Sequence, residues 1–324
     1  MADGDNFLKT CVEGFNLGNL VEAKQFRRVE SLGERLSFKV LAPSGEWFLE
    51  AFREPTFLAS DIRFLCEYAR RLASRGLGPE LHSWGVGSHF GTMELEGQTF
   101  RVTCRGWLRG ERCGPDDWDE EYLAQVGQLL ARMHDVTSGW QPDLSRVAWN
   151  FSLSAGQAVE RIRSWGFVEL GQAAFLERVA DKIEEALAGL DMAHQTVIHG
   201  DPWYGNLLRC HGGLKAVDLS ACGFGPRVGD IAVWLYWMVH SLGPERWAEP
   251  FDALLSAYES IHALDDRERF VIPHLACLRH LWFLVEEVEE RMVIAPKDRH
   301  AIDFYIQDHV SAVRTVHELG VLEP

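Results

Sequence analysis

A short polar loop behind an apolar strand constrains this chain more than any other stretch. Residues 199–206 read His-Gly-Asp-Pro-Trp-Tyr-Gly-Asn, and the apolar pair Val197 and Ile198 precedes them. The short apolar segments that follow, with Gly212 and Gly213 between them, are typical of a β-hairpin. We therefore expect the polar side chains of this loop to gather at the ends of short buried strands.

Three side chains of this region have the chemistry that phosphoryl transfer to an alcohol requires. Asp201 is followed five positions later by Asn206, and twelve positions after that by Asp218. In such a reaction one carboxylate accepts the proton of the hydroxyl group, while an amide oxygen and a second carboxylate hold magnesium. The spacing and the order of these residues therefore indicate a kinase-like site.

This segment resembles the aminoglycoside phosphotransferase and choline kinase superfamily. Members carry a His-Gly-Asp loop with an Asn five residues after the Asp, then an Asp at the end of a hydrophobic strand and another at the start of the next helix. The resemblance implies an α+β, bilobal protein-kinase-like fold. It implies that Asp201 is the catalytic base and that Asn206 and Asp218 are the magnesium ligands. His199 and Asp230 would brace the catalytic loop.

The N-terminal part of the chain has the alternation of an antiparallel sheet. Residues 1–24 form a short helical or frayed lead-in, and a helix is expected at 57–74. Short turns separate the strands, as in a meander. We expect a small five-stranded sheet, with strands at 26–30, 36–41, 47–52, 91–96 and 100–104.

The boundary between two lobes is expected at residues 105–111. This segment contains Trp-Leu-Arg-Gly-Glu, which is similar to the family's linker, whose backbone would bind the edge of the adenine. The chain would then divide into an N-terminal nucleotide-binding lobe, residues 1–104, and a C-terminal catalytic and substrate lobe, residues 105–324. Helical periodicity beyond Asp230 predicts that the second lobe is large and mainly helical.

The third strand departs from the family's pattern. Glu50 stands where relatives place the lysine that binds the nucleotide phosphates, and Leu65 stands near the helix position that should pair with that lysine. A carboxylate about 4 Å from a triphosphate is opposed by about 4 kcal/mol per charge at an effective dielectric of about 20. Three alternatives stay open: Arg53 takes the role, Lys39 reaches across from the neighbouring strand, or the protein is a pseudokinase or holds its cofactor differently.

Composition excludes several classes of protein. With 47% hydrophobic and 25% charged residues, the chain is typical of a soluble globular protein, and its net charge of −16 argues against a nucleic-acid partner. The seven cysteines form no Cys-x-x-Cys pair, which favours reduced thiols. The N-terminus lacks the pattern of a signal peptide, and the longest apolar run, Ile231–Val239, is about half the length of a membrane span. We therefore expect a cytoplasmic protein without a membrane partner.

Together these observations predict a kinase that depends on magnesium and a nucleoside triphosphate, ATP or GTP. It would transfer the γ-phosphate to a hydroxyl of a small molecule, an aminoglycoside-, choline- or homoserine-like alcohol. Two alternatives remain: a Ser/Thr protein kinase similar to the bacterial stress-response kinases, and, because of Glu50, a pseudokinase or metabolite-binding protein. No motif identifies the acceptor or the oligomeric state.

Overall fold

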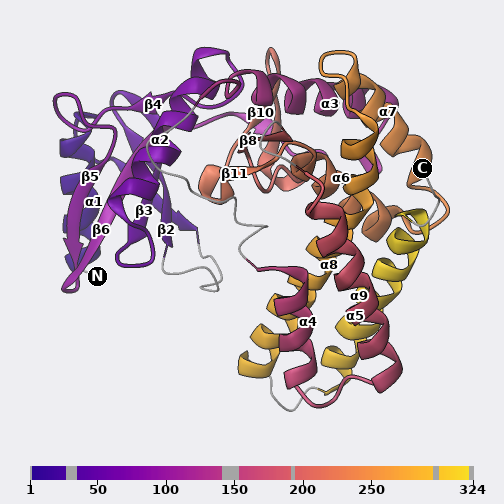
Figure 1. Cartoon of the computed structure of the whole chain (residues 1–324). Helices are drawn as coiled ribbons and strands as arrows, with labels where there is room; N and C mark the ends of the chain where they lie inside the picture. The colour runs from indigo at the N-terminus through magenta and orange to yellow at the C-terminus, as the bar shows by residue number, and fades with distance from the viewer. Residues whose placement is uncertain (1, 27–34, 141–152, 191–193, 295–298, 321–324) are drawn as a thin grey trace. The chain divides into compact units, whose positions relative to one another are not determined.

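The computed structural model describes residues 2–26, 35–140, 153–190, 194–294 and 299–320 (Figure 1). Contacts within the described residues divide the chain into two compact units. The first unit contains the residues up to Glu111 together with Leu208–Ser220. The second unit contains the remaining described residues, from Arg112 to Leu207 and from Ala221 onward.

The first unit is built on an antiparallel sheet. Within the described residues this sheet has six strands, in the order β1-β2-β3-β6-β4 with β5 also paired to β6, so the prediction of five strands was wrong. The strand that was missed is β4, which is two residues long and too short to show a periodic pattern. The predicted three-strand meander is confirmed, although β1 begins earlier than expected and residues 27–30 of the predicted strand lie outside the described residues. The strands are β1 (Glu22–Phe26), β2 (Arg35–Ala42), β3 (Gly45–Arg53), β4 (Leu81–His82), β5 (Gly91–Leu95) and β6 (Gln98–Gly106).

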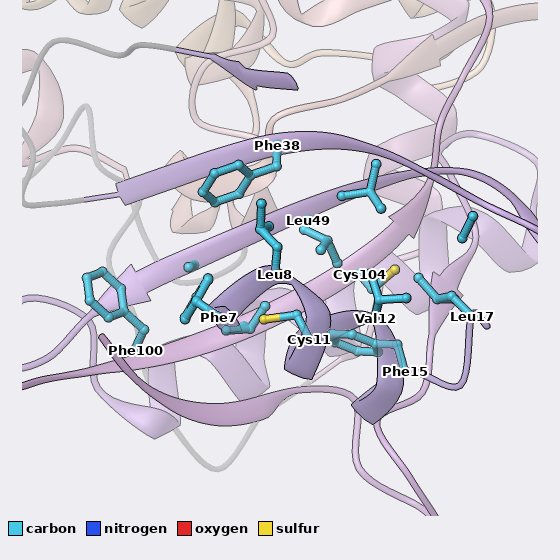
Figure 2. Close-up of a cluster of buried hydrophobic side chains, with 14 residues drawn as sticks. Phe7, Leu8, Cys11, Val12, Phe15, Leu17, Phe38, Leu49, Phe100 and Cys104 are labelled. Carbon is cyan, nitrogen blue, oxygen red and sulfur yellow. The ribbon is translucent and has the colours of Figure 1, made fainter. Parts of the chain in front are cut away.

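Helix α1 (Ala2–Gly14) covers one face of this sheet (Figure 2). Its apolar side chains recur at helical spacing and pack against alternate residues of the strands, as Figure 2 shows. Burying each large apolar side chain contributes about 1.5–3 kcal/mol, which is why the lead-in folds as a helix. The cluster includes Phe7, Leu8, Cys11, Val12 and Phe15 on the helical side and Phe38, Leu49, Ala51, Phe100, Val102 and Cys104 on the sheet.

Helix α2 (Ala59–Ser74) follows β3. Asp61 begins the helix by accepting a hydrogen bond from the backbone N–H of Leu58, at 2.9 Å. Leu65 is fully buried on the apolar face of α2, and the opposite face is polar. The position opposite the expected lysine is therefore a packing residue.

A predicted hairpin leads to Asp218 and is confirmed. Strands β9 (Leu207–Cys210) and β10 (Gly213–Ala216) pair with each other, and β9 pairs with the short strand β7 (Gly110–Glu111). Gly212 and Gly213 take positive φ angles of 96° and 113° at the turn, which glycine adopts without strain. The backbone N–H of Ala216 donates to the carbonyl oxygen of Leu77 at 2.8 Å, which ties the hairpin to the segment that follows α2.

The second unit is mainly helical, as predicted. Helices α4, α5, α8 and α9 lie alongside one another (Figure 1), and α3 packs on α7. A Cβ at Gly127 of α3 would lie 2.2 Å from the carbonyl oxygen of Leu254, so glycine permits this close helix packing. The helices are α3 (Glu120–Asp135), α4 (Ala155–Ser164), α5 (Leu170–Leu187), α6 (Val228–Leu242), α7 (Ala248–Glu259), α8 (Asp266–Ile294) and α9 (Arg299–Gly320).

A two-stranded antiparallel sheet of β8 (Gln195–Ile198) and β11 (Gly223–Pro226) stands among these helices. Together the sheet-based first unit and the helical second unit confirm the predicted α+β fold class. Among the described helices, none combines the length and the apolar composition that crossing a membrane requires.

Candidate active site

The His-Gly-Asp loop leaves β8 and is held by a buried carboxylate. Asp230, in the first turn of α6, accepts hydrogen bonds from the backbone N–H groups of His199 (2.9 Å) and Gly200 (2.8 Å). Gly200 has a φ of 81°, and a Cβ there would lie 2.3 Å from the carbonyl oxygen of Ala221. The positive end of the α6 helix dipole also favours the negative charge of Asp230. The path of the loop is therefore fixed at both of these residues.

His134 connects α3 to the same carboxylate. Its Nε2 lies 3.1 Å from Asp230 Oδ2, and its Nδ1 lies 2.9 Å from the hydroxyl oxygen of Tyr258. An ionised carboxylate only accepts hydrogen bonds, so Nε2 carries the hydrogen of the contact with Asp230. Burial raises the pKa of Tyr258, which keeps that hydroxyl protonated. The three side chains thus form one buried chain of hydrogen bonds behind the loop.

The carboxylate of Asp201 is held through both of its oxygens. Arg279 of α8 donates to Oδ1 at 2.5 Å, and Asn206 Nδ2 donates to Oδ2 at 3.1 Å. The same Nδ2 group also donates to the backbone oxygen of Asp201 at 2.9 Å. Because Asn206 uses its amide hydrogens on Asp201, its Oδ1 is the atom with which it can bind a cation.

Arg279 is buried between two aromatic rings. The guanidinium carbon lies 5.2 Å from the centroid of the Tyr236 ring and 4.7 Å from that of Phe283, so both contacts are cation–π interactions. Within the described part of the chain, Arg279 Nε and Nη1 have no hydrogen-bond partner. The Asp201 carboxylate is therefore its principal charge partner. This pair was not predicted, although Arg279 and its neighbour His280 interrupt an apolar stretch at 275–281, and such an interruption is a sequence signal of a buried polar site.

Asp218 belongs to the first unit and is held by a guanidinium. Arg35 of β2 donates to both of its carboxylate oxygens, at 2.9 and 3.1 Å, and Ser220 Oγ donates at 2.8 Å. Burial by itself raises the pKa of Asp218, but the charge of Arg35 and these hydrogen bonds outweigh it and hold the pKa below its ordinary value. Asp218 also has a φ of 56°, a strained angle for a residue with a side chain.

Glu50 lies at the centre of β3 between two arginines. Arg35 Nη1 lies 3.3 Å from Glu50 Oε1, and Arg105 of β6 contacts Oε2. The strand register pairs Glu50 with Ser37 and with Thr103, each two residues from one of the arginines, so all three charged side chains occupy the sheet face opposite α1. Their exposed fractions are 7% for Arg35, 2% for Arg105 and 1% for Glu50. Arg35 therefore bridges Glu50 and Asp218.

Comparison with known proteins places the chain in a family. The model of the phosphotransferase enzyme family (APH) matches residues 25–271. The chain belongs to this phosphotransferase family. The homoserine kinase of Paraburkholderia phytofirmans is 32% identical over 141 residues, which are 42% of this chain and 39% of that protein. The homoserine kinase of Polaromonas naphthalenivorans is 25% identical over 254 residues, 75% of this chain and 74% of that protein.

Solved structures share the fold of this phosphotransferase. The amicoumacin kinase hAmiN, in complex with AMP-PNP, Ca²⁺ and Ami, has a TM-score of 0.76 at 16% identity over 98% of both chains. A microcompartment-associated aminopropanol kinase has a TM-score of 0.70 at 17% identity, over 97% of this chain and 96% of that one. A choline/ethanolamine kinase family protein from Mesorhizobium loti has a TM-score of 0.61 at 16% identity, over 97% of this chain and 98% of that one. The predicted superfamily and its kinase-like fold are confirmed.

The two cations proposed from the sequence have other contacts in this phosphotransferase. The Lys39 ammonium lies 2.7 Å from Glu46 Oε1 and 4.6 Å from the centroid of the Trp107 ring. Arg53 Nη1 donates to Gln98 Oε1 at 3.3 Å. The role of Lys39 and Arg53 as nucleotide-binding residues stays a prediction.

The predicted magnesium ligands are hard oxygen donors. The Asn206 amide oxygen and the Asp218 carboxylate are of the kind that Mg²⁺ prefers, so these residues fit the ion. Asp201 and Asn206 lie in the second unit of the phosphotransferase and Asp218 lies in the first, and their convergence on one metal pocket stays a prediction. No cluster of three or more His, Cys, Asp or Glu side chains suited to a metal occurs among the described residues.

Proposed function

We propose that this phosphotransferase transfers the γ-phosphoryl group of ATP or GTP to a hydroxyl group of a small molecule. The observation that carries the proposal is the Asp201 carboxylate, held through one oxygen by Arg279 and through the other by Asn206. A general base must keep a fixed direction to meet the proton of an incoming hydroxyl. Membership of the phosphotransferase family supports the same chemistry.

In the proposed reaction the hydroxyl oxygen of the acceptor attacks the γ-phosphorus, and the bond from that phosphorus to the β–γ bridging oxygen breaks. Asp201 accepts the hydroxyl proton, and the nucleoside diphosphate leaves. Asn206 and Asp218 would hold magnesium, which neutralises charge on the phosphoryl group when it is bound. Asp230 keeps the loop in place through the N–H groups of His199 and Gly200.

We propose an amino alcohol as the acceptor, with homoserine as the first candidate. Two homoserine kinases and an aminopropanol kinase are similar to this chain, and its net charge of −16 favours a cationic group. The partly exposed aromatic residues Trp203 and Tyr204 follow Asp201 after one proline, and Trp203 stacks on Trp237 with the ring centroids 5.0 Å apart. Such rings attract an ammonium group.

ATP as a substrate and seven free thiols fit a cytoplasmic location.

The test combines a substrate panel with a variant of the base. The purified chain is incubated with Mg-ATP or Mg-GTP and, in turn, homoserine, aminopropanol, choline, ethanolamine and an aminoglycoside, and the phosphorylated product is measured by mass spectrometry. We expect one amino alcohol to be phosphorylated, and we expect Asp201→Ala to lower kcat by about 10²–10⁴-fold while nucleotide affinity is kept. Asp252→Ala, on an exposed part of α7, is the matched control.

Other outcomes would replace the proposal. Nucleotide binding without turnover on any acceptor would favour the pseudokinase or metabolite-binding alternative, to which the acid at position 50 points. Phosphorylation of a protein, with no small molecule accepted, would favour the Ser/Thr kinase alternative.

A further inference from the structure

We propose that Arg35 is an exchangeable counter-ion in the nucleotide site. Without metal it holds Asp218, and when magnesium binds to Asp218 its guanidinium moves to the nucleotide phosphates, in the role that the family gives to a strand lysine. Glu50 keeps the guanidinium attached to β3 while it exchanges one partner for the other. This inference rests on the proposed function, because it concerns the same nucleotide and metal.

The contacts of Asp218 show which interaction a metal ion would disturb. Arg35 donates one hydrogen bond to each carboxylate oxygen of Asp218, at 2.9 and 3.1 Å. A magnesium ion that coordinates either oxygen would bring two positive charges next to the guanidinium, and like charges at that separation repel strongly. Metal binding at Asp218 must therefore weaken or displace the Arg35 contact.

The contacts of Glu50 show where the Arg35 guanidinium would remain after it leaves Asp218. Arg35 Nη1 also lies 3.3 Å from Glu50 Oε1, so a guanidinium that leaves Asp218 remains attached to β3. Arg105 engages the other oxygen of Glu50, which fixes the direction of this carboxylate. The displaced guanidinium would then stay on the same sheet face as position 50, where the family pattern has its phosphate-binding lysine.

The net charge of this cluster indicates why a nucleotide would bind together with the metal ion. The two arginines and the two carboxylates of Asp218 and Glu50 sum to zero, and all but Asp218 are more than nine-tenths buried. A bound magnesium ion would add two positive charges to this neutral group, and the phosphates of a bound nucleotide would compensate for them. A guanidinium binds phosphate oxygens in a bidentate manner, as it binds Asp218 in this structure.

The experiment measures binding and needs no turnover. Divalent-cation affinity is measured without nucleotide, with Mn²⁺ as the probe in electron paramagnetic resonance, and ATP affinity is measured by calorimetry with and without Mg²⁺. For Arg35→Met we expect Mn²⁺ to bind about tenfold more tightly, because Asp218 is released, and Mg-ATP to bind about tenfold more weakly or worse, because one charge-assisted contact is lost. Arg63→Met, on an exposed position of α2, should change neither affinity.

A purely structural role for Arg35 predicts a different pattern. In that case both affinities of Arg35→Met fall together with its melting temperature, and this result, or no change in either affinity, would overturn the inference. If Arg35→Met does not fold, the double variant Arg35→Met/Glu50→Gln keeps one buried cation and one buried anion and should show the same opposite shifts. A wild-type chain that binds neither Mn²⁺ nor Mg-ATP would refute the proposed function itself, whereas normal wild-type binding without opposite shifts in the variants would refute this inference alone.

Discussion

Replacing Asp230 by asparagine tests whether one buried carboxylate orders the His-Gly-Asp loop. Asp230 is fully buried and accepts three hydrogen bonds, from the backbone N–H groups of His199 and Gly200 and from His134 Nε2. Asparagine has one carbonyl oxygen and an NH₂ group in place of the second oxygen. If the carbonyl takes the position of Oδ2, it keeps His199 and His134, and the NH₂ group then faces the N–H of Gly200.

The expected loss follows from these three bonds. An unsatisfied buried donor at Gly200 costs about 1–3 kcal/mol, and each of the other two bonds falls from about 1.5–3 kcal/mol for a charged acceptor to about 0.5–1.5 kcal/mol for a neutral one. The carboxylate also loses its interaction with the α6 dipole, about 0.3–1 kcal/mol. Since a neutral amide is less costly to bury, we expect a net loss of about 3–5 kcal/mol in the free energy of unfolding.

The assay is thermal and urea unfolding of the variant beside the wild type and Asp252→Asn, a matched change on the exposed surface of α7. A loss of about 3–5 kcal/mol corresponds to a decrease in melting temperature of roughly 6–20 °C in a unit of this size. Asp252→Asn should stay within about 0.5 kcal/mol of wild type. If Asp230→Asn also stays within about 1 kcal/mol, the loop does not depend on this carboxylate and the reasoning is refuted.

Three further predictions concern the second unit. Gly200→Ala should lower the melting temperature, because Gly200 has a positive φ and the new Cβ would lie 2.3 Å from a backbone carbonyl oxygen. Gly171→Ala, at a position of α5 where the new Cβ meets no atom within 4 Å, should instead raise the free energy of unfolding by about 0.5–1 kcal/mol. Equal effects of the two substitutions in a thermal melt would contradict this. Arg279→Met should lower kcat about tenfold or more with nucleotide KM unchanged, because Asp201 loses a charged partner; steady-state kinetics with unchanged kcat would argue against the pair. Burial holds the pKa of His280 well below 6.5, so the unfolded chain binds a proton that the folded chain does not, and stability should fall as pH decreases below about 6.5. Urea unfolding at pH 7.5 and 5.5 should show a smaller pH effect in His280→Phe, and an unchanged pH effect would refute the assignment.

Local patterns in the sequence were sufficient for much of the fold. The hairpin turn at Gly212 and Gly213, the buried face of α2 and the mainly helical second unit follow from turn chemistry and periodicity, which are short-range properties. The start of β1 was predicted four residues too late, since residues 22–26 alternate only weakly between exposed and half-buried positions. An edge strand with little burial carries a weak periodic signal.

The long-range ion pairs could not be predicted in the same way. Arg35 and Asp218 are 183 residues apart, and Arg279 and Asp201 are 78 apart. An isolated arginine in a strand or a helix is usually a surface cation, and only the tertiary structure shows that these two are buried beside acids. The candidate base and the metal ligands have a recognisable spacing, whereas no spacing connects them to their charge partners, even where an arginine stands out in an apolar stretch as Arg279 does.

The cluster around Glu50 shows why a single motif position is a poor guide to function. The family pattern needs a strand lysine and a helix acid that pairs with it, and this chain has Glu50 and Leu65 near those two positions. In the structure the strand position carries an acid, Glu50, and two cations reach it from the neighbouring strands, Arg35 of β2 and Arg105 of β6. Leu65 then needs no charge, which agrees with its full burial on α2. Glu50 and the two arginines thus form a buried cluster of opposite charges on one sheet face, and the acid at position 50 contacts both arginines. Restoring a lysine there with Glu50→Lys should therefore destabilise the first unit, because it would place three cations beside Asp218 with no second acid to compensate.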